Sequence, residues 1–190
     1  MQSTTGTPLS DDAHPDAPAP ESSAGRSRLL GTVLTVAAFT FAADLGTKIW
    51  ALRTLTPGQP QPLIGDWIRL NLIRNSGAAF SIGDGMTWVM TLIALVITIV
   101  AVRAALRVRN LPWALALGML IGGSLGNLVD RFVRPPGFLR GHVVDFIDYF
   151  GLFIGNVADI AIVLAAPLMA WLFLRGVLPE TPPAASAVDD

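Results

Sequence analysis

Hydrophobic residues are concentrated in four long runs along the 190-residue chain. The runs cover approximately residues 29–52, 86–102, 111–129 and 155–174. A bilayer core about 30 Å thick is crossed by about 20 mostly apolar helical residues, and each run has or approaches that length. The pattern predicts an all-α membrane protein with four transmembrane helices.

The connection between the first two runs, approximately residues 55–85, has a different pattern. Apolar and polar residues alternate from Ile68 to Ile73, which is typical of a half-buried β-strand. The short apolar stretch 78–82 is a candidate partner strand. We therefore expect a small β-sheet between the first two transmembrane helices.

The two ends of the chain are poor in large apolar side chains. Residues 1–28 are rich in Pro, Ser, Ala, Asp and Gly, and residues 176–190 form a second such segment. Segments of this kind cannot bury enough apolar surface to offset their ordering entropy, so we predict two disordered tails. They flank a four-helix transmembrane domain over residues 29–175. The segments of this domain outside the membrane on the outer side are approximately 55–85 and 132–154.

Composition excludes several classes of function. Only 14% of the residues are charged, against about 25% in soluble domains, and the net charge of −1 does not favour binding to nucleic acid. The absence of cysteine excludes disulfides, thiolate metal sites and a cysteine nucleophile. Two histidines are too few for a histidine-based metal site.

Arginine placement gives a first indication of orientation. Arg103, Arg107 and Arg109 crowd the short connection between the second and third runs, which favours a cytoplasmic location for that side. Both termini would then be cytoplasmic. The opposite side also carries cations, so the arginine tally alone leaves the orientation open.

Polar residues within the apolar runs converge on one membrane face in this topology. Ionisable groups at membrane depth cost about 2.5–3.5 kcal/mol each and usually face a cavity or one another. Their convergence predicts a polar site between the outer helix ends. The ionisable residues that fall there are Asp44, Lys48, Asp130, Arg131 and Asp159.

Two carboxyl groups are candidates for catalysis. Asp145 and Asp159 each lie among apolar neighbours, and partial burial raises the pKa of a carboxyl group. Two adjacent carboxyl groups share a proton, so that one can activate water while the other protonates a scissile carbonyl oxygen. The structural alternative stays open at this point: Asp159 could cap its helix, and Asp145 could be a loop carboxylate at headgroup level.

Other polar residues occur at helical spacings. Asp44 and Lys48 are four residues apart, which favours an ion pair within one helix. Asn127 and Asp130 are three residues apart, as are Asn156 and Asp159, so each amide lies on the helix face of its acid.

Two neighbouring features concern the third run. Arg131 follows Asp130 directly and is a candidate to neutralise it. Gly122, Gly123 and Gly126 give this helix a small-residue surface, which indicates close helix packing more than contact with substrate.

The segment around residues 74–80 contains a turn. Asn75, Ser76 and Gly77 favour a turn, and the small residues that follow could line a surface for an extended peptide. Arg74 beside the turn is placed to meet a lipid headgroup or a backbone carbonyl.

Taken in order, five short motifs resemble those of bacterial lipoprotein signal peptidases, the signal peptidase II family. They are Asp44-Leu-Gly-Thr-Lys48, Asn75-Ser-Gly-Ala-Ala-Phe80, Gly122-Gly-Ser-Leu-Gly-Asn127-Leu-Val-Asp130-Arg131, Val143-Val-Asp145-Phe-Ile147 and Asn156-Val-Ala-Asp159. Each motif alone is weak, but five in this order on four spans are specific. The resemblance covers approximately residues 29–175.

The resemblance implies an aspartic endopeptidase of the bacterial inner membrane. Such enzymes cleave diacylglyceryl-modified prolipoproteins on the amino side of the lipidated cysteine, and they are inhibited by globomycin. The implied catalytic residues are Asp145 and Asp159, at an active site on the extracytoplasmic face without metal or cofactor. The implied site-supporting residues are Asp44, Lys48, Arg74, Asn75, Gly77, Asn127, Asp130, Arg131 and Asn156. Expected partners are prolipoproteins and membrane lipids, with the enzyme as a monomer.

Two other functions fit the sequence less well. A presenilin-like protease carries Gly-x-Gly-Asp within a span, whereas Ser81-Ile-Gly-Asp84 lacks the first glycine and lies outside the apolar runs. A small transporter or accessory subunit could use acids as a proton relay, but acids near the middle of a span would favour that function and none occurs here.

Overall fold

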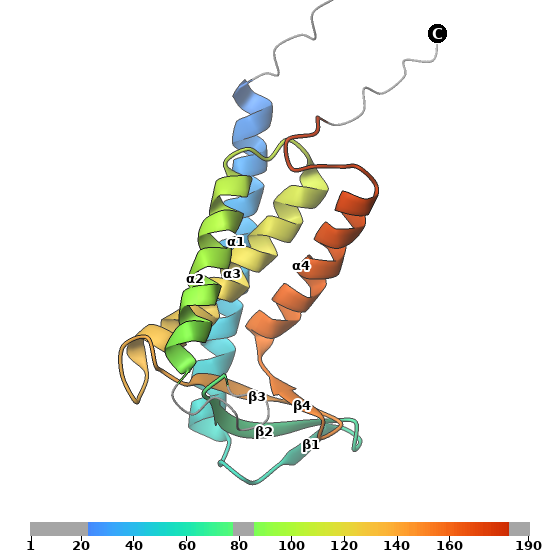
Figure 1. Cartoon of the computed structure of the whole chain (residues 1–190). Coiled ribbons are helices and arrows are strands. Elements are labelled where there is room, and N and C mark those ends of the chain that lie inside the picture. The colour runs from blue at the N-terminus through green and yellow to red at the C-terminus, as the bar shows by residue number, and fades with distance from the viewer. Residues whose placement is uncertain (1–22, 78–85, 183–190) are drawn as a thin grey trace, which may run out of the picture.

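The computed structural model describes residues 23–77 and 86–182 and contains four long helices (Figure 1). Each is long and apolar enough to cross a membrane, which confirms the four predicted spans. The helices are α1 (Ser23–Thr54), α2 (Thr87–Ala105), α3 (Leu111–Val133) and α4 (Val157–Leu174).

Helix α3 lies at the centre of the bundle and packs against each of the other three helices. Its glycines permit this close approach, as the small-residue pattern predicted. A Cβ atom at Gly122 would lie 2.5 Å from the carbonyl oxygen of Ala37 on α1, and one at Gly123 would lie 2.7 Å from that of Ala158 on α4. Larger residues at these two positions would therefore push α1 and α4 away from α3.

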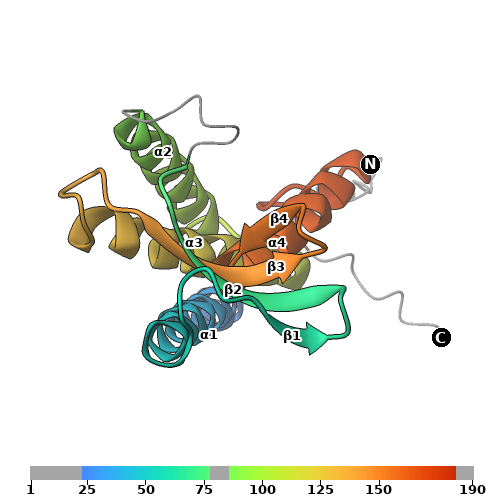
Figure 2. The same ribbon diagram turned by 90° about the horizontal axis from the view of Figure 1, so that it is seen from below.

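A four-stranded antiparallel sheet lies across one end of the bundle (Figures 1 and 2). The strands, in spatial as well as sequence order, are β1 (Gln61–Ile64), β2 (Ile68–Asn75), β3 (Val143–Tyr149) and β4 (Phe153–Gly155). The predicted sheet is confirmed, and β2 contains the predicted strand 68–73. The sheet is also wider than predicted, because β3 and β4 come from the segment between α3 and α4. The other predicted strand, 78–82, lies outside the described residues.

Strand β3 connects the sheet to the helices through its alternating side chains. Val144 and Phe146 are buried in a cluster with Ala51 and Leu55 at the end of α1 and Leu72 of β2. Successive side chains on a strand point to opposite faces, so Asp145 faces away from this cluster. The packing of Val144 and Phe146 against α1 therefore sets the direction of the Asp145 carboxyl group.

The chain's described N-terminal residues are helical. Helix α1 begins at Ser23, so the predicted disordered tail is wrong for residues 23–28. The Arg26 guanidinium donates a 2.8 Å hydrogen bond to the carbonyl oxygen of Leu106 at the end of α2, which anchors the first turns of α1. Arginine is also a good helix former, so the helix extends beyond the apolar run. Residues 1–22 lie outside the described part of the chain.

The start of the other predicted tail is also ordered. The Asn110 side chain donates to the carbonyl oxygens of Leu178 (2.9 Å) and Thr181 (3.1 Å), and the Trp113 indole donates to that of Val177 (2.8 Å). The backbone N–H of Arg109 donates to the carbonyl oxygen of Pro179 at 2.7 Å. The prediction of disorder is wrong for residues 176–182, because distant side chains satisfy a backbone that cannot form its own core. Residues 183–190 lie outside the described part.

Candidate active site

Asp145 lies on β3 at the junction between the sheet and the bundle, and only 1% of its surface is exposed. Each carboxylate oxygen accepts a hydrogen bond from a side-chain amide. Asn75 Nδ2 donates to Oδ2 at 2.8 Å, and Asn156 Nδ2 donates to Oδ1 at 2.6 Å. A buried carboxyl group with two neutral donors is held in one orientation.

The position of Asn75 follows from the pairing of β2 with β3. Asn75 is opposite Val143 and Ile73 is opposite Asp145, so Asn75 lies diagonally across the strands from Asp145 on the same face. The backbone N–H of Gly77 donates to Asn75 Oδ1 at 2.7 Å, which directs the amide nitrogen toward Asp145. Gly77 has φ +87°, a backbone conformation that favours glycine, so the turn depends on this residue.

Asp159 lies in the first turn of α4, where it forms a capping box with Asn156. The backbone N–H of Asp159 donates to Asn156 Oδ1, and the backbone N–H of Asn156 donates to Asp159 Oδ2, both at 3.1 Å. Asn127 Nδ2 of α3 donates to the other carboxylate oxygen at 2.9 Å. Asp159 thus does cap its helix, as the structural alternative held, but Asp145 lies on a buried strand and not in a loop.

Asn156 connects the two candidate catalytic carboxyl groups. Its side-chain nitrogen donates to Asp145 while its backbone nitrogen donates to Asp159. Its side chain is fully buried, and it also donates to Asn127 Oδ1 at 3.2 Å. One residue therefore holds both acids, which come from separate segments of the chain.

A buried charge network lies beside these amides. Lys48 Nζ is 2.7 Å from Asp44 Oδ2 and 2.9 Å from Asp130 Oδ2, and it donates to Asn127 Oδ1 at 2.9 Å. All three charged side chains are essentially inaccessible. The ion pair predicted from the spacing of Asp44 and Lys48 is confirmed, and the network orients Asn127 toward Asp159.

Arg131 attracts the Asp130 charge, as predicted, but the direct ion pairs of Asp130 are with Lys48 and Arg134. The Arg131 guanidinium donates to the carbonyl oxygens of Ser76 (3.0 Å) and Gly141 (3.3 Å). Side chains of consecutive residues on a helix point in different directions, so the Arg131 side chain does not lie beside that of Asp130. It instead joins α3 to the turn that carries Asn75.

Arg74 is not brought into this cluster. It is exposed on β2 opposite Val144, and strand alternation directs it to the face away from Asn75. The structure thus unites eight of the nine supporting residues around the two acids, with Arg74 at the surface.

Burial raises the pKa of Asp145 to about 7. The hydrogen bond from Asn75 lowers this pKa, the negative charge of Asp159 raises it, and the hydrogen bond from Asn156 and the charge of Lys48 lower it. A carboxyl group with this pKa can hold or release a proton near neutral pH, as proton transfer requires.

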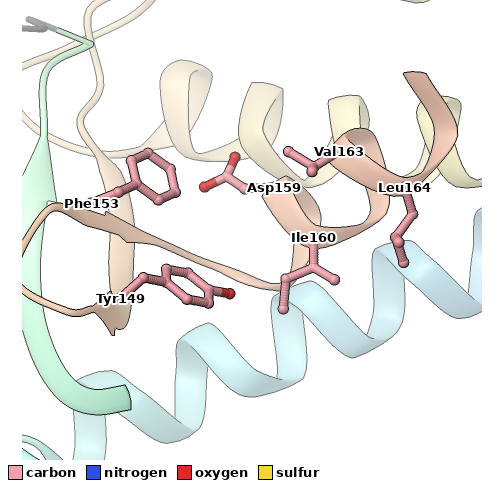
Figure 3. Close-up of a pocket in the computed structure, with 6 residues that line it drawn as sticks. All are labelled: Tyr149, Phe153, Asp159, Ile160, Val163 and Leu164. Carbon is pink, nitrogen blue, oxygen red and sulfur yellow. The ribbon is translucent and has the colours of Figure 1, made fainter. Parts of the chain in front are cut away.

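An apolar cavity of about 330 Å³ opens beside Asp159 (Figure 3). Figure 3 shows the Asp159 carboxyl group directed toward the Phe153 ring, with Val163 and Leu164 of α4 on the opposite side of Asp159. Burial raises the pKa of the Tyr149 hydroxyl, and the Asp159 charge adds to this effect, so the hydroxyl remains a hydrogen-bond donor. The other lining residues are Ile160, Val163 and Leu164.

Sequence reasoning missed Tyr149 and Phe153. The available signal was the aromatic cluster of Tyr149, Phe150 and Phe153 directly before the Asn156 motif. The hairpin of β3 and β4 stacks the Tyr149 and Phe153 rings with centroids 6.0 Å apart, which forms one wall of the cavity.

Comparison with known proteins identifies the family. A family model described as signal peptidase (SPase) II matches residues 36–175. The chain belongs to the signal peptidase II family. A lipoprotein signal peptidase from Rhodococcus jostii (strain RHA1) is 46% identical over 170 residues, which cover 90% of this chain and 84% of that protein. One from Mycolicibacterium smegmatis (strain ATCC 700084 / mc(2)155) is 49% identical over 165 residues, which cover 87% and 69% of the two chains.

A solved structure has a similar fold. It is a bacterial membrane enzyme determined by the in meso method, with a TM-score of 0.66 and 30% identity. The match covers 76% of this chain and 94% of that one. As a member of the signal peptidase II family, the chain is a multi-pass bacterial membrane protein and an aspartic-type peptidase.

Proposed function

We propose that this enzyme removes the signal peptide of diacylglyceryl-modified prolipoproteins on the amino side of the lipidated cysteine, with Asp145 and Asp159 as the catalytic pair. The observation that carries this proposal is that a single residue, Asn156, donates hydrogen bonds to both carboxyl groups beside an apolar cavity. The proposed substrate is that of the lipoprotein signal peptidases that resemble this chain.

The surroundings of the two acids favour different protonation states before reaction. Asp159 lies at the N-terminus of α4, where the helix dipole favours a negative charge, and it accepts a backbone N–H. Asp145 has its pKa raised by burial. We therefore assign the initial proton to Asp145 and the initial charge to Asp159.

Hydrolysis then follows from two proton transfers. Asp159 takes a proton from water as the water oxygen bonds to the scissile carbonyl carbon, and Asp145 gives its proton to the carbonyl oxygen. The resulting diol collapses when Asp159 passes its proton to the departing amide nitrogen. Asp145 recovers its proton from the hydroxyl as the C–N bond breaks, which restores both acids.

The position of the cavity suits a substrate that remains partly in lipid. Ile160, Val163 and Leu164 line it, and all three are exposed on the bundle surface, where a membrane would surround α4. Burial of an acyl chain contributes about 0.8 kcal/mol per CH₂, so the lipid anchor can hold the scissile bond beside Asp159.

The proposed orientation places this site at the extracytoplasmic face and both termini in the cytoplasm. The short loop with Arg103, Arg107 and Arg109 lies at the opposite end of the bundle from the sheet (Figure 1), in agreement with the positive-inside rule. We further propose that the enzyme acts as a monomer without metal or cofactor and that globomycin inhibits it. Among residues 23–77 and 86–182, no three His, Cys, Asp or Glu side chains form a metal-binding group.

The transporter alternative is not favoured, because the chain belongs to a peptidase family and its buried acids cluster at one end of the bundle. A proton relay would need such groups along the depth of the membrane.

Replacement of either catalytic acid tests the proposal. We expect Asp145→Asn and Asp159→Asn each to lower the rate of cleavage of a purified diacylglyceryl-modified prolipoprotein by at least about 100-fold, since general acid–base groups contribute about 10²–10⁴-fold. Asp66→Asn, an exposed acid in the β1–β2 turn, is the matched control and should cleave normally. Normal cleavage by either catalytic-site variant, at unchanged thermal stability, would refute the aspartyl mechanism.

A further inference from the structure

A second cavity, of about 450 Å³, lies at the end of the bundle opposite the active site. Its walls come from the last turn of α2 and from the docked C-terminal segment, and it takes no part in the proposed cleavage. The lining residues are Val100, Arg103, Ala104, Leu106, Arg107 and Glu180.

The cavity contains opposite charges that do not pair with each other. Arg103 and Arg107 are four residues apart at the end of α2, and both are exposed. In the described part of the chain, no ion pair joins either guanidinium to Glu180 or to another acid. The cavity therefore separates two cations from one anion.

The anion is held in place by the fold. The backbone around Glu180 is fixed by hydrogen bonds from Asn110 to the carbonyl oxygens of Leu178 and Thr181 and from the Arg109 N–H to that of Pro179. Glu180 is thus presented to the cavity by an ordered turn.

We propose that this cavity binds the headgroup of a phospholipid that carries a primary ammonium group, of the ethanolamine type. Arg103 and Arg107 would bind the phosphate, since guanidinium groups suit phosphate oxygens. Glu180 accepts hydrogen bonds from the ammonium group, which a trimethylated choline headgroup cannot donate. Val100, Ala104 and Leu106 provide an apolar wall for the first part of an acyl chain.

This chemistry distinguishes between three headgroups. A glycerol headgroup bears the phosphate and hydroxyl donors, but it has no positive charge to pair with Glu180. A choline headgroup has a cation without a hydrogen-bond donor. Of the three, the ethanolamine headgroup alone offers Glu180 both a positive charge and a hydrogen-bond donor.

The test uses the full-length protein in detergent, titrated with dihexanoyl phosphatidylethanolamine, phosphatidylcholine or phosphatidylglycerol. The apparent Kd is obtained from the shift in thermal unfolding. We expect the ethanolamine lipid to bind about tenfold more tightly than the other two, the equivalent of one charge-assisted hydrogen bond. Equal binding of all three lipids, or tighter binding of the glycerol lipid, would overturn the proposal.

Variants assign the binding to this cavity. Arg103→Gln with Arg107→Gln should weaken ethanolamine-lipid binding at least about tenfold, and Glu180→Gln should abolish the preference over choline. The charge-matched control is Arg28→Gln with Arg175→Gln, which removes two other arginines from the same end and should leave binding unchanged. If the double Arg103/Arg107 variant is unstable without lipid, the single Arg107→Gln variant takes its place. An equal loss in the control would show general charge attraction and refute the site.

A soluble headgroup separates a lipid ligand from a free phosphate ester. Glycerophosphoethanolamine carries the same charges without acyl chains and should bind at least about tenfold more weakly, because it forgoes contact with the apolar wall. Binding as tight as that of the lipid would overturn the assignment to a membrane lipid. None of these outcomes depends on peptidase activity.

Discussion

At the scale of single residues, Asp145 shows how one carboxyl group is suited to proton transfer near neutral pH. Burial between the sheet and the helix bundle disfavours its charge, while the hydrogen bonds from Asn75 and Asn156 favour the charged form. The raised pKa of Asp145 means that the folded protein binds this proton more tightly than the unfolded chain does. The stability contribution of this group is therefore complete below about pH 4 and is lost as the pH rises through about 7.

The same balance predicts a pH shift for Asn75→Ala. Because the hydrogen bond from Asn75 lowers the pKa of Asp145, its loss should raise that pKa. If protonated Asp145 is required, activity falls as the pH rises through about 7 in the native enzyme. In the variant this alkaline limb should move to higher pH, as measured by the pH dependence of kcat/KM.

A control distinguishes this effect from a general loss of activity. Arg74→Ala changes the adjacent residue on β2, whose exposed side chain is directed away from the acids. It should keep the native pH profile. An Asn75→Ala profile that is lowered uniformly without displacement would contradict the assigned role of Asp145.

Lys48 provides a second residue-scale prediction. Its ammonium group contacts Asp44 and Asp130 in a fully buried network, so Lys48→Met leaves buried carboxylates with less compensation. Breaking a buried ion pair from one side costs about 3–5 kcal/mol. We expect a marked fall in the thermal unfolding temperature in detergent, whereas Arg53→Met, at an exposed position of the same helix, should have little effect. Equal stability of the two variants would show that the network contributes nothing.

At the scale of elements, α3 organises the molecule because its glycines let two other helices approach its backbone. Gly122 faces α1, Gly123 faces α4, and Gly126 lies against the Asp44 side chain. The same helix carries Asn127 and Asp130 one turn further on. Close packing and site geometry therefore depend on the same surface, and a change in helix separation would displace the amide that holds Asp159.

Gly122→Ala tests this dependence. The added methyl group would lie 2.5 Å from the Ala37 carbonyl oxygen and 2.7 Å from Thr40 Cβ, so α1 and α3 must separate. Overpacking of this kind costs about 1–3 kcal/mol, and we expect both lower thermal stability and slower cleavage. Gly46→Ala is the matched control, because nothing lies within 4 Å of its Cβ position, and it should be neutral or slightly stabilising. Similar effects of the two substitutions would contradict the packing argument.

At the scale of the whole molecule, the proposed catalytic pair and the proposed lipid-binding cavity lie at opposite ends of one bundle. Connections between helices alternate between these ends, so the sheet and the site share one end while the Arg103–Arg107 turn and residues 176–182 share the other (Figure 1). Membrane insertion then assigns each end to a different aqueous compartment. The proposed orientation gives the acids access to substrates outside the cytoplasm.

Cysteine labelling tests this orientation directly, because the chain contains no cysteine. Gln59→Cys lies in the exposed connection between α1 and β1, and Arg175→Cys lies at an exposed position just after α4 at the other end. A membrane-impermeant maleimide should label the first variant in intact spheroplasts and the second only after the membrane is opened. The reverse pattern would invert the topology.

The sequence by itself determined the four spans and the strand 68–73, and it indicated Asp145 and Asp159 as candidate acids, because these inferences depend on local patterns. A run of about twenty apolar residues is long enough to span a bilayer, whatever the rest of the chain does. The side chains of a strand alternate between its two faces regardless of which strand it pairs with. Helical spacing likewise determined the Asp44–Lys48 pair. These features require no knowledge of which segments meet.

The tertiary structure alone decided which segments meet. Pairing of β2 with β3 brings Asn75 to Asp145, and the side chain of Asn156 reaches the acid eleven residues before it because β4 turns the chain back. The direct ion pair of Asp130 with Lys48 was likewise decided by tertiary structure, because Lys48 comes from a different helix, α1. Long-range contacts also ordered residues 176–182, whose composition favours disorder, because Asn110 and Trp113 supply hydrogen bonds that local sequence does not reveal.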